Sequence, residues 1–398
     1  MKYRMICDSC GTSLPSNSQF YTCPRCQSRL RIEYEDPTID FSNKDSMRGI
    51  FRFLSKLPLE GKSCISMGEG ITPAILLEED LFENLEVWIK NESLNPTGTY
   101  KDRPAAVAVS KAKEMGAKGV VVASDGNAAP AVAAYAAKAC LSCVVLMPQK
   151  TPEFRCLQAK AYGAIIFLVD GTINDCLNIA RELSTLTHFH NCSTTSSVNP
   201  YQIEGNKSIA FEIAEQFKAL PDWVVLPVGG GGLLSAVVKG FEELQNGRLI
   251  SKSPRILATQ AKNCAPFVEA FMENRAIQKL EKPQKSVALT IALPYPPDGD
   301  LALKYLKKTS GVAVSVEEKE IIKGVFHLSS KYGILAEPSG AVPFAGLLKA
   351  FSKKIIRSGE KCLVLMTGTG LKTINTYKES PGNIVKVSKN AYEIIEHL

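Results

Sequence analysis

Six short apolar segments, separated by stretches with helical patterns, constrain the fold of this chain more than any other feature. They are rich in Val, Ile and Leu, and they occupy residues 119–123, 143–147, 165–169, 223–227, 255–258 and 362–366. Strands that are apolar at nearly every position are typical of parallel sheets covered on both faces by helices. We therefore predict an α/β fold in which parallel sheets are flanked by helices.

Four cysteines near the start of the chain predict a separate small unit. Cys7 and Cys10 form one Cys-x2-Cys pair, Cys23 and Cys26 form another, and twelve residues separate the two pairs. Four thiolates at this spacing can surround one zinc ion tetrahedrally, with two sulfurs from each tight turn. Nothing nearby offers an open coordination position, so we interpret the zinc as structural and residues 1–35 as a zinc ribbon.

The predicted strands fall into two groups, one before and one after about residue 198. This grouping predicts two α/β domains that face each other across a cleft, where a cofactor would be expected. We assign the ribbon and its linker to residues 1–45, a larger domain to residues 46–104 plus 199–398, and a smaller domain to residues 105–198.

The charge and hydropathy of the chain exclude several classes of function. The net charge is +7 and no run of Lys or Arg is dense, so we expect no nucleic-acid partner. Residues 128–147 are weakly polar but divide into an Ala-rich helix and a short strand closed by Pro148, so we expect no membrane span. The start lacks the apolar core of a signal peptide, and the other cysteines are scattered. We expect a cytoplasmic protein.

Four consecutive glycines predict an anion-binding site. They follow the strand at 223–227 and precede a helical pattern, in the order Gly229, Gly230, Gly231, Gly232 and then Leu233. A backbone without side chains can curl tightly and point successive N–H groups at one anion, and the helix dipole adds to the attraction. The pattern favours phosphate binding over a simple turn. It is not a dinucleotide fingerprint, because no acidic residue follows at the right distance.

Three further motifs could each bind a ligand, but each alone also has an ordinary structural explanation. Residues 95–103 (NPTGTYKDR) place Lys101 before an Ala-rich helix predicted from Pro104, although a lysine in a Lys-Asp-Arg run is usually only a solvated surface residue. Residues 124–129 follow a strand, and their turn could hold a carboxylate or phenolate oxygen or simply cap a helix. Residues 366–372 end the last strand with hydroxyls that could bond a heterocycle nitrogen or simply form a turn.

Taken together and in this order, the motifs resemble the threonine synthases, which belong to the fold-type-II (tryptophan-synthase-β-like) pyridoxal-phosphate enzymes. The resemblance also rests on residues 67–73 (MGEGITP), 197–205 (SVNPYQIEG) and 337–341 (EPSGA), and it covers nearly the whole chain. It implies a pyridoxal-phosphate-dependent lyase that acts on a small amino-acid substrate, binds the cofactor in the larger domain and forms a homodimer.

The resemblance further implies roles for individual residues. Lys101 would bind the cofactor's aldehyde and then move protons, Asn127 would bond its phenolic oxygen, and Thr367 would face its pyridine nitrogen. The five residues from Gly229 to Leu233 would hold its phosphate. The substrate would contact Thr99, Ser124, Asp125, Ala128, Ser197 and Gln202.

Three positions leave the substrate open. Threonine synthases usually carry an arginine where Gln202 stands, and an uncharged amide loses the charge-assisted contact to a phosphate. Thr369 replaces a histidine that is common in the family's last turn. Asp125 stands where relatives usually use Ser or Thr to bind the substrate carboxylate, so it suggests an acid/base role or a substrate with an extra amine.

The leading hypothesis is β/γ-elimination or replacement on a small amino acid, with conversion of O-phosphohomoserine to threonine as the favoured reaction. The alternative is an ammonia-lyase or dehydratase that acts on serine, threonine or 2,3-diaminopropionate, because residues 125–127 resemble diaminopropionate ammonia-lyases and residues 337–341 are shared with serine/threonine dehydratases. A third possibility is a non-catalytic, pyridoxal-phosphate-binding regulatory protein. The presence of Lys101 argues against it, since a pure binder would not need that amine.

Overall fold

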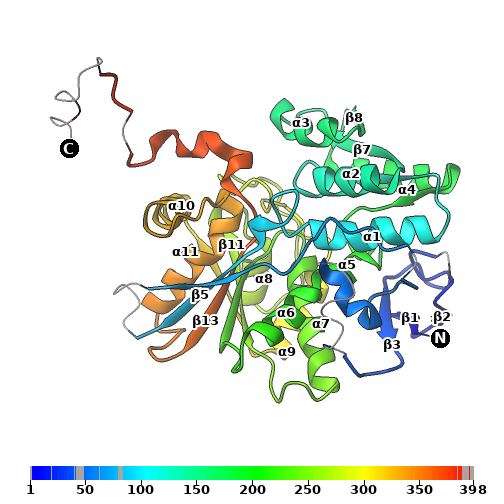
Figure 1. The fold of residues 1–398 in the computed structure, drawn as a ribbon, viewed down its shortest axis with the longest axis horizontal. Helices are drawn as coiled ribbons and strands as arrows, with labels where there is room; N and C mark the ends of the chain where they lie inside the picture. Colours follow the sequence, from blue (N-terminus) through cyan, green and yellow to red (C-terminus); the bar gives the residue numbers. More distant parts are fainter. Residues whose placement is uncertain are drawn as a thin grey trace.

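The computed structural model describes residues 2–18, 20–39, 41, 49–61, 63–78, 84–382, 384–387 and 394. They form a small antiparallel sheet and two larger sheets that are flanked by helices (Figure 1). The α/β class with parallel sheets is therefore confirmed. The predicted boundary between linker and larger domain, at residues 45 and 46, lies outside the described residues.

The N-terminal ribbon is a three-stranded sheet with the strand order β2-β1-β3. Its strands are β1 (Tyr3–Cys7), β2 (Ser13–Pro15) and β3 (Leu30–Tyr34), and β1 is antiparallel to both neighbours. Met5 and Ile32 pair across β1 and β3 and are fully buried. They share one apolar core with helix α1 (Asp102–Glu114), so the ribbon packs against the body of the protein.

A parallel sheet with the order β8-β7-β6-β9 forms the second layer. Its strands are β6 (Gly119–Ala123), β7 (Ser142–Pro148), β8 (Ile165–Val169) and β9 (Phe189–Asn191), and its helices are α2 (Ala128–Ala139), α3 (Glu153–Ala161) and α4 (Ile173–Leu186). Strands β6 and β7 are buried, as their apolar sequences predict. The prediction that β8 is covered on both faces is wrong. It is an edge strand, and Ile165, Phe167 and Leu168 are exposed.

The largest sheet has six strands in the order β12-β11-β10-β13-β5-β4. They are β4 (Ala74–Leu77), β5 (Glu86–Asn91), β10 (Trp223–Pro227), β11 (Arg255–Ala261), β12 (Val312–Val316) and β13 (Lys361–Met366). Neighbouring strands are parallel except at the edge, where β4 is antiparallel to β5. The predicted strands at 223–227, 255–258 and 362–366 are confirmed, whereas β4, β5 and β12 had no predicted counterpart.

Helices cover both faces of this sheet (Figure 1). They are α6 (Ser208–Gln216), α7 (Gly232–Asn246), α8 (Pro266–Met272), α9 (Gly299–Lys308), α10 (Glu318–Tyr332) and α11 (Pro338–Ser352), whereas the short α5 (Gln202–Asn206) packs against α1 and α7. Short 3-10 helices are η1 (Gly49–Lys56), η3 (Glu92–Leu94), η4 (Lys262–Cys264) and η5 (Gly370–Glu379). One apolar core includes residues of α6, α7 and α9, and another on the opposite face includes residues of α10 and α11.

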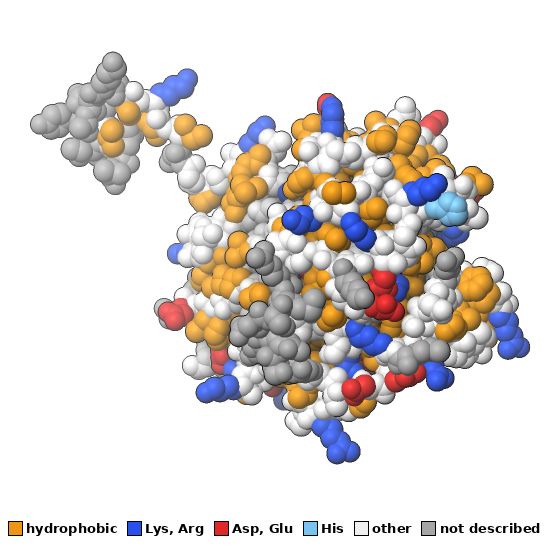
Figure 2. All heavy atoms as spheres, turned by 45° about the vertical axis from the view of Figure 1, so that its right-hand side comes forward, with side chains coloured by type: hydrophobic (Ala, Val, Ile, Leu, Met, Phe, Trp, Pro, Cys, Tyr) orange, Lys and Arg blue, Asp and Glu red, His pale blue; other side chains and the backbone are white. Residues whose placement is uncertain are grey.

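The surface carries mixed charge. On the face drawn in Figure 2, Lys and Arg side chains are scattered among apolar and acidic side chains rather than gathered in one patch. In the parts of the chain that the structure describes, no helix combines the length and the apolar character needed to cross a membrane.

Candidate active site

One cavity of about 140 Å³ brings together most of the predicted site residues. It lies where the loops that follow β6, β10 and β13 meet the start of α1. The predicted residues that line it are Lys101, Ser124, Asp125, Asn127, Ala128, Gln202, Gly229, Gly230, Gly231, Gly232, Leu233 and Thr367. Such a concave site with a few convergent polar groups is what recognition of a small ligand requires.

Lys101 directly precedes α1, which begins at Asp102, two residues before the predicted start. Its Nζ donates a hydrogen bond to Thr194 Oγ1 at 3.2 Å and lies 4.9 Å from the centroid of the Tyr100 ring. Thr194 and Tyr100 line the same cavity as Lys101. The amine is therefore held at the cavity, unlike that of a solvated surface lysine.

The start of α1 is anchored by four buried charged side chains, which we call the Arg103 cluster: Lys90, Glu92, Arg103 and Glu212. Arg103 donates to both carboxylates at 2.8 Å, and Lys90 donates to Glu212 at 2.8 Å. Two positive and two negative charges balance each other, which is the condition under which buried charges are tolerated. The cluster fixes the backbone two residues from Lys101.

The four glycines form a cradle at the start of α7. Gly231 has a φ of +94°, in the left-handed region that favours glycine. A Cβ on Gly231 would lie 2.8 Å from Asp298 O, and a Cβ on Gly229 would lie 3.1 Å from Ile291 Cα. The chain can pass through this space only without side chains, and the start of a helix offers unpaired N–H groups to an anion.

Two buried amides of α5 point to a polar ligand beside this cradle. Gln202 Nε2 and Asn206 Oδ1 are buried and have no hydrogen-bond partner among the described residues, and both residues line the cavity. A Cβ on Gly232 would lie 3.5 Å from Gln202 Nε2. Buried polar atoms are rarely unpaired in folded proteins, so a bound group is expected to satisfy them. The cradle and the Gln202 Nε2 donor fit the phosphate of pyridoxal phosphate, whereas Asn206 Oδ1 is an acceptor and requires a donor.

Asp125 lies beside a cation. Its carboxyl Oδ2 is 3.8 Å from Arg155 Nη1, which also donates to the Asp125 backbone oxygen at 3.0 Å. The side chain of Asp125 is 43% exposed at the cavity wall. A neighbouring guanidinium reduces the repulsion that a substrate carboxylate would meet here.

Glu337 is a site residue to which the sequence analysis assigned no role. It lies directly before α11, lines the cavity and accepts a hydrogen bond from Asn127 Nδ2 at 2.8 Å. Burial raises the pKa of the Glu337 carboxyl, while the Asn127 hydrogen bond and the positive charges of Lys372 and Arg155 act in the opposite direction. Glu337 also lines an adjoining cavity of about 750 Å³, so its carboxyl stands between the two spaces.

Two predicted substrate contacts lie outside the described lining of the cavity. Thr99 is buried, and its Oγ1 accepts a hydrogen bond from Lys101 N at 3.3 Å. Ser197 Oγ is 2.9 Å from Thr195 Oγ1. Conversely, Thr194 and Asn206 line the cavity although no local pattern marked them; only the 197–205 motif hinted at the helix that carries Asn206.

The four cysteines of the ribbon also converge. Sγ of Cys7 is 3.4 Å from that of Cys26, Sγ of Cys10 is 3.6 Å from that of Cys23, and all four sulfurs lie within 4.8 Å of one another. Sulfurs bound to one zinc at 2.3 Å would be separated by about 3.8 Å in a tetrahedron. The hydroxyl of Thr12 lowers the pKa of Cys10 to about 6, whereas burial raises the pKa of Cys7 to about 11. The arrangement fits a structural zinc.

Comparison with known proteins places this site in context. The family model for pyridoxal-phosphate-dependent enzymes matches residues 65–368. The threonine synthase of Methanocaldococcus jannaschii is 35% identical over 377 residues, which cover 92% of each chain. The threonine synthase of Methanosarcina acetivorans is 33% identical over 383 residues, which cover 94% of this chain and 93% of that protein.

Solved structures show the same fold. The processed form of threonine deaminase isoform 2 from Solanum lycopersicum is 23% identical with a TM-score of 0.63, covering 78% of this chain and 88% of that one. The diaminopropionate ammonia lyase of Escherichia coli is 17% identical with a TM-score of 0.66, covering 79% of this chain and 88% of that one. These likenesses show the fold that this chain shares with both enzymes.

Proposed function

Because the chain belongs to the pyridoxal-phosphate-dependent enzymes and is a threonine-synthase-like lyase, we propose that it converts O-phosphohomoserine to threonine. The observation that carries the proposal is the convergence of Lys101 and the four-glycine cradle on one cavity. The cofactor, when bound, supplies a conjugated ring that withdraws electrons from the substrate's α-carbon and makes its α-proton acidic.

We assign Lys101 two tasks. Its Nζ would hold the cofactor's aldehyde and, once released, would take the α-proton and return a proton later in the reaction. The hydrogen bond to Thr194 Oγ1 keeps Nζ at the cavity. The glycines at the start of α7 would hold the phosphate of the cofactor, with Gln202 Nε2 as a further donor.

The other lining residues would orient the cofactor and the substrate. The backbone at the start of α2 would bind the substrate carboxylate next to Asp125, whose charge is offset by Arg155. Asn127 would bond the phenolic oxygen of the cofactor while Glu337 holds its amide in place. A neutral hydroxyl such as that of Thr367 would leave the pyridine nitrogen largely unprotonated, which favours elimination over reactions that need a long-lived carbanion.

A second candidate function is favoured by the charge of the cavity. Among the described residues that line it, Lys101 is the only cation, whereas Asp125 and Glu337 are both carboxylic acids. A phosphate on the substrate would find no arginine among the described lining residues, and Gln202 lies beside the cradle that we assign to the phosphate of the cofactor. This environment favours a neutral or amine-bearing leaving group, and we therefore retain an ammonia-lyase or dehydratase that acts on serine, threonine or 2,3-diaminopropionate.

Purified holoenzyme incubated with each candidate amino acid distinguishes the two functions. Threonine and phosphate are expected from O-phosphohomoserine. Ammonia and a 2-oxo acid from serine or diaminopropionate, with no threonine formed from O-phosphohomoserine, would establish the second function and overturn the first.

A variant of the cofactor-binding lysine tests the catalytic assignment itself. Lys101→Ala should abolish turnover and the visible absorbance of the covalently bound cofactor, because no other described lining residue supplies an amine. Lys138→Ala, on the exposed side of α2, is the control and should leave both unchanged. Full turnover by the Lys101 variant would contradict the assignment, whereas a wild type that turns over none of the candidate amino acids would reopen the regulatory alternative.

We also propose that the ribbon holds a structural zinc, that the enzyme forms a homodimer, and that it acts in the cytoplasm. The convergence of the four cysteine sulfurs supports the zinc. The family resemblance supports the dimer, and the free cysteines among the described residues suit a reducing compartment. Zinc analysis of the purified protein and sedimentation at micromolar concentration test the first two.

A further inference from the structure

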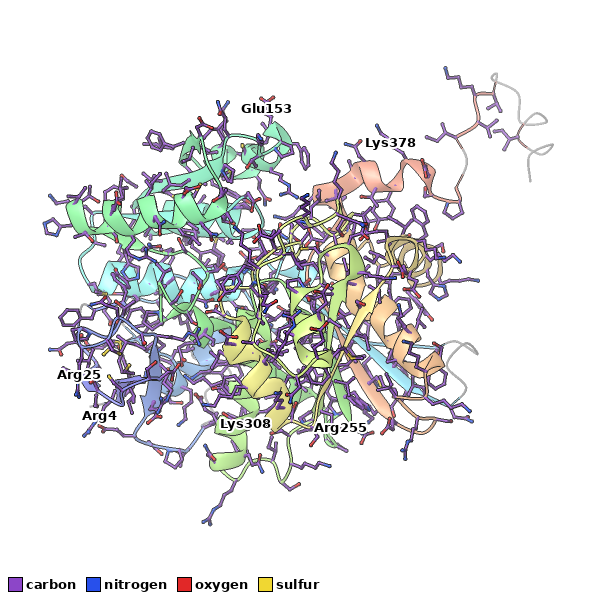
Figure 3. The ribbon with its side chains drawn as sticks, turned by 180° about the vertical axis from the view of Figure 1, so that it is seen from behind. Arg4, Arg25, Glu153, Arg255, Lys308 and Lys378 are labelled. Atoms are coloured by element: carbon purple, nitrogen blue, oxygen red, sulfur yellow. The ribbon has the colours of Figure 1, made fainter. Side chains whose placement is uncertain are left out.

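The ribbon extends one arginine towards the centre of the molecule. Arg4 and Arg25 lie at the outer edge of the ribbon (Figure 3), but the Arg29 side chain is only 19% exposed. Its Nη2 lies 3.7 Å from Asp298 Oδ1, and its Nη1 lies 4.0 Å from Asp8 Oδ2. Arg29 therefore connects the ribbon to a carboxylate of the larger domain.

Asp298 stands directly behind the glycine cradle. Its backbone N donates to Gly230 O at 2.8 Å, and a Cβ on Gly232 would lie 3.3 Å from Asp298 Oδ2. The side chain is 1% exposed and accepts hydrogen bonds from Ser196 N at 3.1 Å. A buried carboxylate thus lies next to the backbone that we assign to the phosphate of the cofactor.

A negative charge at this position opposes phosphate binding. Two like charges that are close together in a poorly solvated site repel each other strongly, unless a cation offsets one of them. Among the described ion pairs, the partner of Asp298 is Arg29. Asp298 has a structural reason to be there, because its hydrogen bonds join the cradle to residues 195 and 196.

We propose that Arg29 is a positioning residue for the cofactor. Its guanidinium offsets the charge of Asp298, so that Asp298 can brace the glycine cradle without repelling the phosphate that binds there. The ribbon is thereby part of the cofactor site, although none of its residues lines the described cavity. The inference rests on the pyridoxal-phosphate dependence of the proposed function and not on the identity of the substrate.

The fold of the ribbon holds Arg29 in the required place. Asp8 N, in the first cysteine turn, donates to Arg29 O at 3.1 Å, and Thr22 forms an isolated antiparallel bridge with Arg29. Arg29 is thus held by backbone contacts on both sides, so its guanidinium reaches Asp298 from a defined position. Such preorganisation is what a residue acting through a neighbour requires.

The experiment compares the binding of pyridoxal phosphate with that of pyridoxal, which lacks the phosphate, to the resolved apoenzyme. Arg29→Gln is expected to raise the Kd of pyridoxal phosphate about tenfold, because removing one partner of a buried ion pair leaves the other charge uncompensated. The Kd of pyridoxal should stay within about twofold of the wild-type value. Arg29→Lys, which keeps the charge, should recover most of the affinity for pyridoxal phosphate.

Variants of Asp298 separate charge from structure. Asp298→Asn removes the repulsion and should bind pyridoxal phosphate at least as tightly as the wild type. Adding Asp298→Asn to Arg29→Gln should restore most of the lost affinity, since the two positions are coupled. Arg4→Gln is the matched control, because Arg4 pairs with Glu35 at 3.2 Å within the ribbon and shares no carboxylate with Arg29 among the described ion pairs.

Several results would overturn the proposal. If Arg29→Gln binds pyridoxal phosphate with wild-type affinity, Arg29 does not support cofactor binding. If it loses as much affinity for pyridoxal as for pyridoxal phosphate, its effect does not act on the phosphate. If Arg29→Gln does not fold, Asp298→Asn decides: a raised Kd refutes the proposal and an unchanged or lowered Kd supports it. An enzyme that binds the cofactor as described but forms no threonine would contradict the proposed function and leave this inference intact.

Discussion

Replacing Glu212 by Gln removes one of the two carboxylates from the Arg103 cluster, in which every side chain is fully buried. Glu212 receives hydrogen bonds at 2.8 Å from Lys90 Nζ and from Nη1 and Nη2 of Arg103. A glutamine keeps one acceptor oxygen but turns an NH2 group towards these donors and leaves a net positive charge in the core. Removing one partner of a buried ion pair lowers the free energy of unfolding by about 3–5 kcal/mol. This is a large part of the roughly 5–15 kcal/mol by which a typical domain is stable.

Urea unfolding followed by tryptophan fluorescence measures this loss. The chain has two tryptophans, and both Trp88 in β5 and Trp223 in β10 belong to the largest sheet, which is also where Lys90 is located. With a slope of about 3 kcal/mol per molar urea, a loss of about 3–5 kcal/mol lowers the unfolding midpoint by about 1–1.7 M.

Glu242→Gln provides the matched control on the neighbouring helix α7. Glu242 pairs with Lys308 at 2.7 Å, but the Lys308 side chain is exposed and that of Glu242 is partly exposed, so the variant should lose less than about 1 kcal/mol. If the two variants lose the same amount, the Arg103 cluster does not stabilise the fold through its buried charges.

The Arg103 cluster also predicts how the stability of the fold changes with pH. Burial alone would raise the pKa of Glu212, but the charges of Arg103 and Lys90 outweigh it and hold that pKa well below its usual range. The folded-state pKa is thus lower than the value of about 4.3 in the unfolded chain. The stabilisation is therefore complete above about pH 4.3 and is lost as the pH falls towards the folded-state pKa. Glu212→Gln should lose less stability than the wild type over this acidic range.

Two further predictions concern the cradle and the ribbon. Gly231→Ala should weaken pyridoxal-phosphate binding, since its Cβ would lie 2.8 Å from Asp298 O. The control is Gly163→Ala, where φ is similarly positive but no atom lies within 4 Å of the new Cβ, so the variant should cost only about 1 kcal/mol of stability. Equal cofactor affinity in the two variants would argue against the cradle. Removing the proposed zinc with a chelator should lower the unfolding midpoint of the wild type, because a metal bound by four cysteines couples metal binding to folding. A purified protein that contains no zinc and is insensitive to chelation would count against the structural zinc.

The strands that could be predicted are those that consist of consecutive apolar residues, because such a run indicates burial on both faces. Strands β6, β7, β10 and β13 are such runs, and both faces of each are covered. Strand β5 was missed because its sequence, EVWIKN, carries charge, and Lys90 is buried there only because Glu212 meets it from α6. Strand β8 looks equally apolar in sequence, but its position at the sheet edge leaves it exposed.

The residues of the candidate site also fall into those that the sequence indicated and those that only the structure revealed. The glycines could be assigned from their local pattern, which follows a strand and begins a helix, whereas Lys101 and Thr367 were singled out only by the combination of motifs and the family resemblance. Thr194, Glu337 and Asp298 contribute contacts that depend on residues far away in the chain. Glu337, for example, meets Asn127 across 210 positions, a pairing that no local pattern encodes.

By itself, then, the sequence determined the α/β class, the four-cysteine ribbon and the turns that carry the amine and the anion cradle, because apolar runs, cysteine spacing and glycine act over a few residues. Only the tertiary structure decided which of these turns face one another. The order of the strands places β10 beside β13 and brings Thr367 to the same cavity as the glycines, and the packing of the ribbon delivers Arg29 to Asp298. These contacts arise from the burial of whole faces of sheets and helices, which is a property of the assembled chain.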